Sequence, residues 1–135
     1  MRSGAVGSIL QKGENIFLFR ELYFDIICCH YIERLGNCAS VPYPIRKLAA
    51  IDENGQKNYI ETLTCYLENF MKLSDTAEAL NVHPNTVRFR MERIYEILGT
   101  DLKNPDDAQN IYTGLRLYNI IKKYRNYTFT MKQEI

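Results

Sequence analysis

Apolar residues recur at the three- and four-residue spacing of a helix along most of this chain. The clearest run is the segment 57–70, whose apolar positions share one face and predict a helix buried on one side. Those positions are Ile60, Leu63, Leu67 and Phe70. A second helix is predicted from Pro105 to about Tyr124, because Asn104 can cap its start and proline suits its first position. Its buried stripe is expected to be Ala108, Ile111, Leu115 and Tyr118.

The segment 20–35 also has helical spacing, but with two apolar stripes rather than one. The first stripe is Leu22, Ile26, Cys29 and Ile32, and the second is Tyr23, Ile27 and Tyr31. Either this helix is covered on two sides, or the stripes form a dimer surface. Gly36 is placed to end the helix. After a loop at 37–44, a short helix is predicted over 45–51, followed by a turn at 52–55.

The two ends of the chain are less regular. Residues 16–19, Ile-Phe-Leu-Phe, have strand propensity, but a lone strand cannot pair its own backbone. We therefore interpret residues 1–19 as a remnant or linker from an upstream domain. Residues 125–135 are polar and are predicted to form a flexible tail. The expected fold class is all-α: a helical bundle that contains a helix-turn-helix, with a short N-terminal strand remnant as an open alternative.

The segment 75–98 predicts the helix-turn-helix itself. Ser74 can cap a short first helix, and Asn81 falls at the turn, where asparagine tolerates the left-handed conformation. Pro84 then suits the first position of a second helix over 84–98. The core residues of this unit are expected to be Ala77, Leu80, Val82, Val87, Met91, Ile94 and Leu98. Many DNA-binding proteins use such a unit to place the second helix in the major groove.

Those core positions leave polar and aromatic side chains on the outer side of the second helix. The candidate DNA-binding residues are His83, Asn85, Thr86, Arg88, Phe89, Arg90 and Arg93. Arg88 is the candidate for a bidentate contact with guanine, whereas Arg90, near the boundary with the core, and Arg93 would reach phosphates. Phe89 could touch a thymine methyl group or pack beneath the turn. His83 alone is better explained as a helix cap than as a base-reading residue.

Charge alone does not establish DNA binding. The chain has 17 Lys and Arg residues against 16 Asp and Glu residues, for a formal net charge of +1. This balance excludes a protein that binds nucleic acid by being basic throughout, but it allows a local basic face. Exposed arginines on a helix are commonly only solvated, and Glu92 and Glu96 can pair with Arg88 and Arg93. The DNA-binding interpretation therefore depends on the pattern of core and turn residues.

The sequence contains no pattern that predicts an enzyme, a metal site or a cofactor. Cys28, Cys29, Cys38 and Cys65 include no CxxC pair, and we interpret them as free thiols in a reducing cytoplasm. The two histidines have no carboxylate partner at a recognisable spacing, and no phosphate-binding glycine loop or nucleophile motif is present. The most apolar segment, 22–32, is too short to span a membrane. We therefore expect a cytoplasmic, non-enzymatic protein that binds neither cofactor nor membrane.

A family resemblance is carried by residues 62–107, which read TLTCYLENFMKLSDTAEALNVHPNTVRFRMERIYEILGTDLKNPDD. This segment resembles the C-terminal helix-turn-helix of the PucR/CdaR family of bacterial transcription regulators, whose pattern includes TAEAL-x-VHRNTVRYRL-x-RI-x-x-LG-x-DL-x-P. The resemblance implies an all-helical domain of the factor-for-inversion-stimulation type that binds double-stranded operator DNA as a homodimer. It also implies an effector-sensing domain upstream of this segment and absent from this chain. Residues 57–124 are then the expected DNA-binding domain, and residues 20–56 a helical connector with a potential role in dimerisation.

Two positions depart from the family pattern. Pro84 stands where the family usually has arginine, which removes an expected phosphate or base contact. Phe89 replaces the usual tyrosine and lacks its hydroxyl group. Two interpretations of the chain follow: a sequence-specific DNA-binding domain with its recognition helix at about 84–98, or a helical dimerisation module whose DNA binding is weakened or lost.

Overall fold

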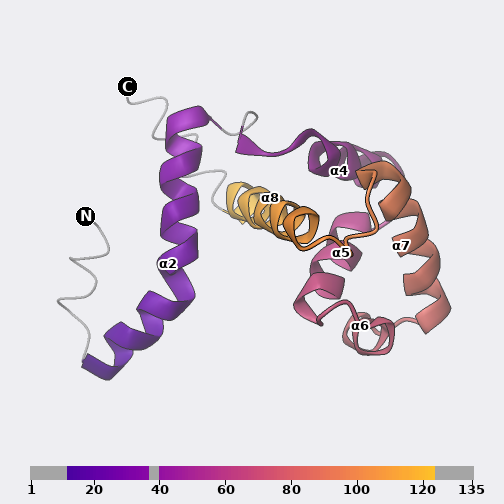
Figure 1. Cartoon of the computed structure of the whole chain (residues 1–135), viewed down its shortest axis with the longest axis horizontal. Coiled ribbons are helices and arrows are strands. Elements are labelled where there is room, and N and C mark those ends of the chain that lie inside the picture. The colour runs from indigo at the N-terminus through magenta and orange to yellow at the C-terminus, as the bar shows by residue number, and fades with distance from the viewer. Residues whose placement is uncertain (1–11, 37–39, 124–135) are drawn as a thin grey trace. The chain divides into compact units, whose positions relative to one another are not determined.

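The computed structural model describes residues 12–36 and 40–123, with side chains from residue 23 onward. Every regular element in these ranges is a helix (Figure 1). In chain order they are α2 (Lys12–Leu35), α4 (Tyr43–Gly55), α5 (Tyr59–Glu68), α6 (Leu73–Leu80), α7 (Pro84–Leu98) and α8 (Pro105–Lys123). The predicted all-α fold class is confirmed. None of these helices combines the length and the apolar character that crossing a membrane requires.

The chain divides into two compact units. One contains α2 together with the end of α8 from residue 119 onward. The other, Val41–Tyr118, contains α4, α5, α6, α7 and most of α8, and therefore holds the predicted helix-turn-helix. The tail predicted at 125–135 lies outside the described residues.

Helix α2 begins at Lys12, well before the predicted start at residue 20. Residues 16–19 lie inside this helix, so the alternative of a short N-terminal strand is wrong. The physical reason is that a helix pairs its backbone groups within its own chain, whereas a four-residue strand needs a partner. Gly36 ends the helix as predicted: its φ is +85°, and its N–H donates to the carbonyl of Ile32 at 2.7 Å.

The two apolar stripes of α2 differ in burial. On the first, Ile32 is buried, while Ile26 and Cys29 are half-buried. The second stripe is about half exposed, at 46–52%, and Leu35 continues it at 48%. Its members are Tyr23, Ile27 and Tyr31. This structure therefore leaves one apolar face of α2 about half exposed.

Helix α4 is longer than predicted, because the expected turn at 52–55 is its last turn. The Asp52 carboxylate accepts hydrogen bonds from the N–H groups of Tyr59 and Ile60, at 2.8 and 2.9 Å. These donors lie in the first turn of α5, and the preceding Asn58 is left-handed at φ +58° and provides no side-chain cap. Asp52 therefore caps α5 from the neighbouring helix.

The core of the Val41–Tyr118 unit forms where α5 packs against α4, α6 and α7. Helix α7 also contacts α4 and α6. The most deeply buried apolar side chains of this core are Ile45, Leu48, Leu63, Val87, Met91, Ile94, Leu102 and Leu115. Helix α8 comes close to the start of α4 at Gly114, where an added Cβ would lie 2.9 Å from Cγ of Pro42. Glycine is needed there because any side chain would displace the proline ring.

Helix α5 ends at Glu68, earlier than predicted, so Phe70 does not lie on its buried face. In the closing turn, the N–H of Met71 donates to the carbonyl of Tyr66 (2.8 Å) and the N–H of Phe70 to that of Leu67 (3.3 Å). This is the Schellman arrangement, in which the residue after the cap adopts the left-handed conformation that glycine favours. Here that residue is Phe70, at φ +55° and 84% exposed. The sequence pattern extended past the point where the helix ends.

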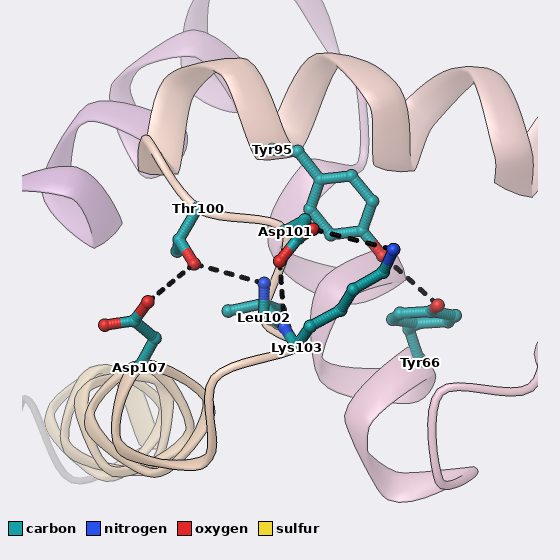
Figure 2. A network of polar contacts seen from close by, with 7 residues as sticks. All are labelled: Tyr66, Tyr95, Thr100, Asp101, Leu102, Lys103 and Asp107. Carbon is teal, nitrogen blue, oxygen red and sulfur yellow. Dashed lines mark hydrogen bonds and ion pairs between the residues drawn. The ribbon is translucent and has the colours of Figure 1, made fainter.

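The connection from α7 to α8 is held by local polar contacts (Figure 2). Gly99 ends α7 at φ +73°, and its N–H donates to the carbonyl of Tyr95 at 2.9 Å. The Thr100 hydroxyl donates to the Asp107 carboxylate at 2.9 Å and accepts from the N–H of Leu102 at 3.2 Å. Leu102 is left-handed at φ +63° and almost fully buried. Its burial offsets the strain in its backbone.

The start of α8 agrees with the prediction. The side-chain oxygen of Asn104 accepts from the N–H groups of Asp106 and Asp107, at 2.8 and 3.4 Å. Pro105 is the first residue of the helix, and the two aspartates favour its positive end. The predicted stripe is buried at Ile111 and Leu115 and half-buried at Ala108 and Tyr118.

Candidate nucleic-acid interface

The first helix of the helix-turn-helix is α6. It begins after Lys72, so Ser74 lies inside it and is not its cap, contrary to the prediction. The buried Thr76 hydroxyl instead donates to the carbonyl of Lys72 at 2.7 Å, one turn earlier. Ala77 is 2% exposed, and its small side chain allows α6 to pack closely against α7. The angle between the two helices therefore depends on a tight apolar contact.

The turn between α6 and α7 has the predicted geometry. Asn81 is left-handed at φ +54°, and its N–H donates to the carbonyl of Glu78 at 3.1 Å. The N–H of Val82 donates to the carbonyl of Ala77 at 3.0 Å, which completes a Schellman motif. Val82 is half-buried.

Helix α7 begins with a cap on its first turn. His83 precedes the helix, and its Nδ1 accepts from the N–H of Asn85 at 3.1 Å. Pro84 occupies the first position, as predicted. Val87, Met91 and Ile94 are all buried against the rest of the unit. The cap and these three core positions determine which side of α7 faces outward.

Most of the predicted site residues are brought together along that outward side, and Arg90 is the exception. The exposed ones are His83, Asn85, Arg88, Phe89 and Arg93, and the half-buried ones are Thr86 and Arg90. Phe89 is 62% exposed, so it does not pack beneath the turn. The guanidinium carbon of Arg88 lies 5.4 Å from the centroid of the Phe89 ring. This cation–π contact holds the Arg88 charge against an exposed ring.

The two exposed arginines of α7 differ in their ionic environment. Arg93 forms an ion pair with Glu96 at 2.6 Å, with both side chains more than 60% exposed. An exposed pair of this kind contributes little to stability and is open to exchange for another anion. Arg88 forms no ion pair within the described part of the chain. Among the exposed cations of α7, Arg88 is therefore the one that no carboxylate of the described residues pairs with.

Arg90 points in another direction. Its Nη1 donates to the hydroxyl of Thr62 on α5 at 3.2 Å, and that hydroxyl donates to the carbonyl of Asn58 at 2.6 Å. Thr62 is fully buried. The sequence prediction placed Arg90 near the core boundary but assigned no role to Thr62.

A second polar bridge joins the same two helices. The hydroxyl of Tyr95 on α7 donates to that of Tyr66 on α5 at 3.2 Å (Figure 2). Burial raises the pKa of Tyr95, and the bond to Tyr66 and the charge of Asp101 add to this effect. The sequence signal for both bridges was weak: two hydroxyl residues, Thr62 and Tyr66, one turn apart on the buried face of α5.

No cluster of His, Cys, Asp or Glu side chains in the described ranges could hold a metal ion.

The sequence of this helix-turn-helix unit matches a known protein family. Residues 59–117 match the family described as the PucR C-terminal helix-turn-helix domain. This segment belongs to that family. The PucR domain begins with α5, contains α6 and α7, and extends into α8, so it includes every candidate site residue. The resemblance seen in the sequence is confirmed.

Three related regulators extend the comparison. The chain is 30% identical over 111 residues to the DNA-binding transcriptional activator AdeR of Bacillus subtilis, covering 79% of this chain and 25% of AdeR. It is 36% identical over 77 residues to the purine catabolism regulatory protein of the same bacterium, covering 57% of this chain and 14% of that protein. It is 35% identical over 74 residues to the carbohydrate diacid regulator of Escherichia coli, covering 55% and 19%.

The chain therefore spans a quarter or less of the length of these three relatives. All three are named as regulators and none as an enzyme, in agreement with the expectation of a non-enzymatic protein. No solved structure matches the chain. The PucR domain is thus a helix-turn-helix of the kind found in DNA-binding transcription regulators.

Proposed function

We propose that this chain carries the sequence-specific DNA-binding domain of a bacterial transcription regulator, with α7 in the major groove. The observation that carries the proposal is the outward side of α7. Three buried core residues and a capped first turn orient this side, and it presents the uncompensated charge of Arg88. A helix of 15 residues held out from a packed unit in this way fits the major groove.

The side chains of α7 suit distinct roles. Arg88 is our candidate for a bidentate contact with guanine, and Asn85 and Thr86 at the helix start for contacts with bases or phosphates. Arg93 can exchange Glu96 for a phosphate. Because Nδ1 of His83 accepts a hydrogen bond, the neutral ring carries its proton on Nε2, which can donate to a phosphate oxygen.

The test is to select bound sequences from a random duplex pool and then to measure variants on the selected site. Arg88→Ala should cost about 1–3 kcal/mol on that site and relax discrimination at one base pair. Arg93→Ala is the matched exposed control: it should weaken binding to selected and random duplexes alike. Equal binding of Arg88→Ala and the parent to both duplexes would contradict the assignment of Arg88.

We further propose that the protein binds DNA as a homodimer through the exposed face of α2. Support comes from the row Tyr23, Ile27, Tyr31 and Leu35, spaced one helical turn apart and about half exposed. A two-fold dimer would place two α7 helices on the halves of an inverted repeat. Duplex DNA lies in the bacterial cytoplasm, so this function implies a cytoplasmic location.

The second candidate function is a dimerisation module that has lost DNA binding. Pro84 favours it, since proline offers neither the charge nor the N–H that the family's usual arginine would supply. The near-neutral net charge of +1 points the same way. Sedimentation with and without duplex DNA separates the two functions: a stable dimer that ignores DNA at low salt would support this module.

A further inference from the structure

We propose that Arg90 is a positioning residue, whose guanidinium group fixes α7 against α5 through Thr62 and does not neutralise a DNA phosphate. This inference rests on the proposed DNA binding of α7. It separates Arg90 from Arg88 and Arg93, although all three arginines lie on the same helix.

The direction of Arg90 follows from helix geometry. An α-helix turns by about 100° per residue, so Arg90 lies roughly 200° around α7 from Arg88. Consistent with this, Arg88 is exposed whereas Arg90 is half-buried and reaches α5. A side chain on that side of α7 faces the packed unit and not the outward face.

The hydrogen bonds around Thr62 are mutually consistent. The Thr62 hydroxyl uses its proton to donate to the carbonyl of Asn58 at 2.6 Å, which leaves its oxygen lone pairs to accept from Arg90 at 3.2 Å. Thr62 is 0% exposed with the guanidinium group in place, so Arg90 and not solvent is the donor to its hydroxyl in this structure. An unpartnered hydroxyl lone pair at that depth would be unfavourable.

Two bridges control an angle better than one. Thr62 and Tyr66 lie one turn apart on α5, and they hold Arg90 and Tyr95 on α7. Together the bridges fix two points along the contact between the helices. Base contacts tolerate only small errors in position, so loss of one bridge should weaken specific binding even though it removes no atom that touches DNA.

The experiment compares Arg90→Met, Thr62→Val, their combination and Thr62→Ser in the full chain. Affinity is measured as a function of salt concentration, at a temperature well below the unfolding midpoint of each variant. Two duplexes are used: one selected with the parent and one of random sequence. Arg90→Met and Thr62→Val should each weaken selected-site binding about three- to tenfold, the worth of one hydrogen bond. The double variant should be no weaker than either single variant, because both remove the same bridge. Thr62→Ser retains the hydroxyl and should restore parental affinity.

The salt dependence distinguishes positioning from phosphate contact. Each phosphate contact contributes about 0.9 to the slope of log affinity against log salt. Arg90→Met should keep the parental slope, whereas the control Arg93→Met, which removes an equal charge from an exposed position, should lower it. A slope lowered by Arg90→Met, with Thr62→Val unchanged in affinity, would overturn the proposal.

The remaining outcomes are also decisive. If Thr62→Val and Arg90→Met lower only the unfolding midpoint and bind the selected duplex as the parent does, the bridge is merely structural and the positioning role is wrong. If the parent itself binds neither duplex at low salt, the proposed DNA binding fails, and the positioning role fails with it.

Discussion

Residues in the left-handed conformation show where this sequence departs from local preference. Among the described residues, six that are not glycine have positive φ. Asn58 and Asn81 are of the type that tolerates it, and Leu102 gains burial in return. Phe70 has neither advantage, since it is unsuited to φ +55° and is 84% exposed. Its position is therefore a point of avoidable strain in the α5–α6 turn.

Replacing Phe70 with glycine should stabilise the protein. The left-handed conformation costs a residue with a Cβ about 1–2 kcal/mol, while glycine loses about 0.5–1 kcal/mol of chain entropy on folding. The net expected gain is about 0.5–1 kcal/mol in the free energy of unfolding, measured by urea denaturation.

Two matched variants test this cause. Phe70→Ala removes the ring but keeps the Cβ, and it should bring no such gain. Gly99→Ala should lose a comparable amount, because Gly99 is at φ +73° with no atom within 4 Å of an added Cβ, which leaves conformational strain as the sole cost. A Phe70→Gly variant less stable than Phe70→Ala would show that strain is not the cause.

Residue-level features were predictable from the sequence where their causes were local. His83, Asn104, Gly36 and Gly99 act on backbone groups within a few residues, so their identity and place in the pattern were sufficient. The bridge between Arg90 and Thr62 spans 28 residues of sequence and depends on how α5 and α7 pack. Periodicity placed Arg90 near a boundary but did not name its partner.

At the scale of elements, the boundaries of α4 and α5 depend on each other. The sequence Asp-Glu-Asn-Gly resembles a turn, and the prediction ended the helix before it. In the structure, Asp52 stays helical and its carboxylate binds the start of α5. The missed cap at Ser74 and the missed end at Glu68 have a similar origin, since backbone hydrogen bonds in the α5–α6 turn decide both boundaries.

Removing the Asp52 carboxylate should destabilise α5. Loss of a capping side chain typically costs about 0.5–2 kcal/mol, so Asp52→Ala should lower the free energy of unfolding by that amount. Asp52→Asn retains one oxygen acceptor and should have a smaller effect, because the two N–H groups bind different carboxylate oxygens. The control is Glu53→Ala, an exposed acidic neighbour in the same helix. Equal losses for Asp52→Ala and Glu53→Ala would indicate a general effect of charge and not of capping.

At the scale of the whole molecule, the PucR domain does not contain the proposed dimer surface. The family match covers residues 59–117, whereas the exposed stripe lies on α2 in the other compact unit. DNA reading and assembly are therefore separable properties in this proposal. A substitution on α2 should change the oligomeric state and leave the fold of the Val41–Tyr118 unit intact.

Placing a carboxylate in the exposed stripe should dissociate the proposed dimer. In Tyr31→Glu and Ile27→Glu, pairing of two α2 helices would bury a charge without a partner, which is strongly unfavourable. Sedimentation equilibrium should give a monomer where the parent gives a dimer, with the urea midpoint of the Val41–Tyr118 unit unchanged. Glu33→Gln, an exposed polar change on the same helix, is the control and should remain dimeric.

On a selected inverted repeat the monomeric variants should lose the advantage of the second half-site, while their affinity for a single half-site equals that of the parent. If the parent and Tyr31→Glu have the same mass, the α2 face is not the dimer contact, and α7 reads DNA without it.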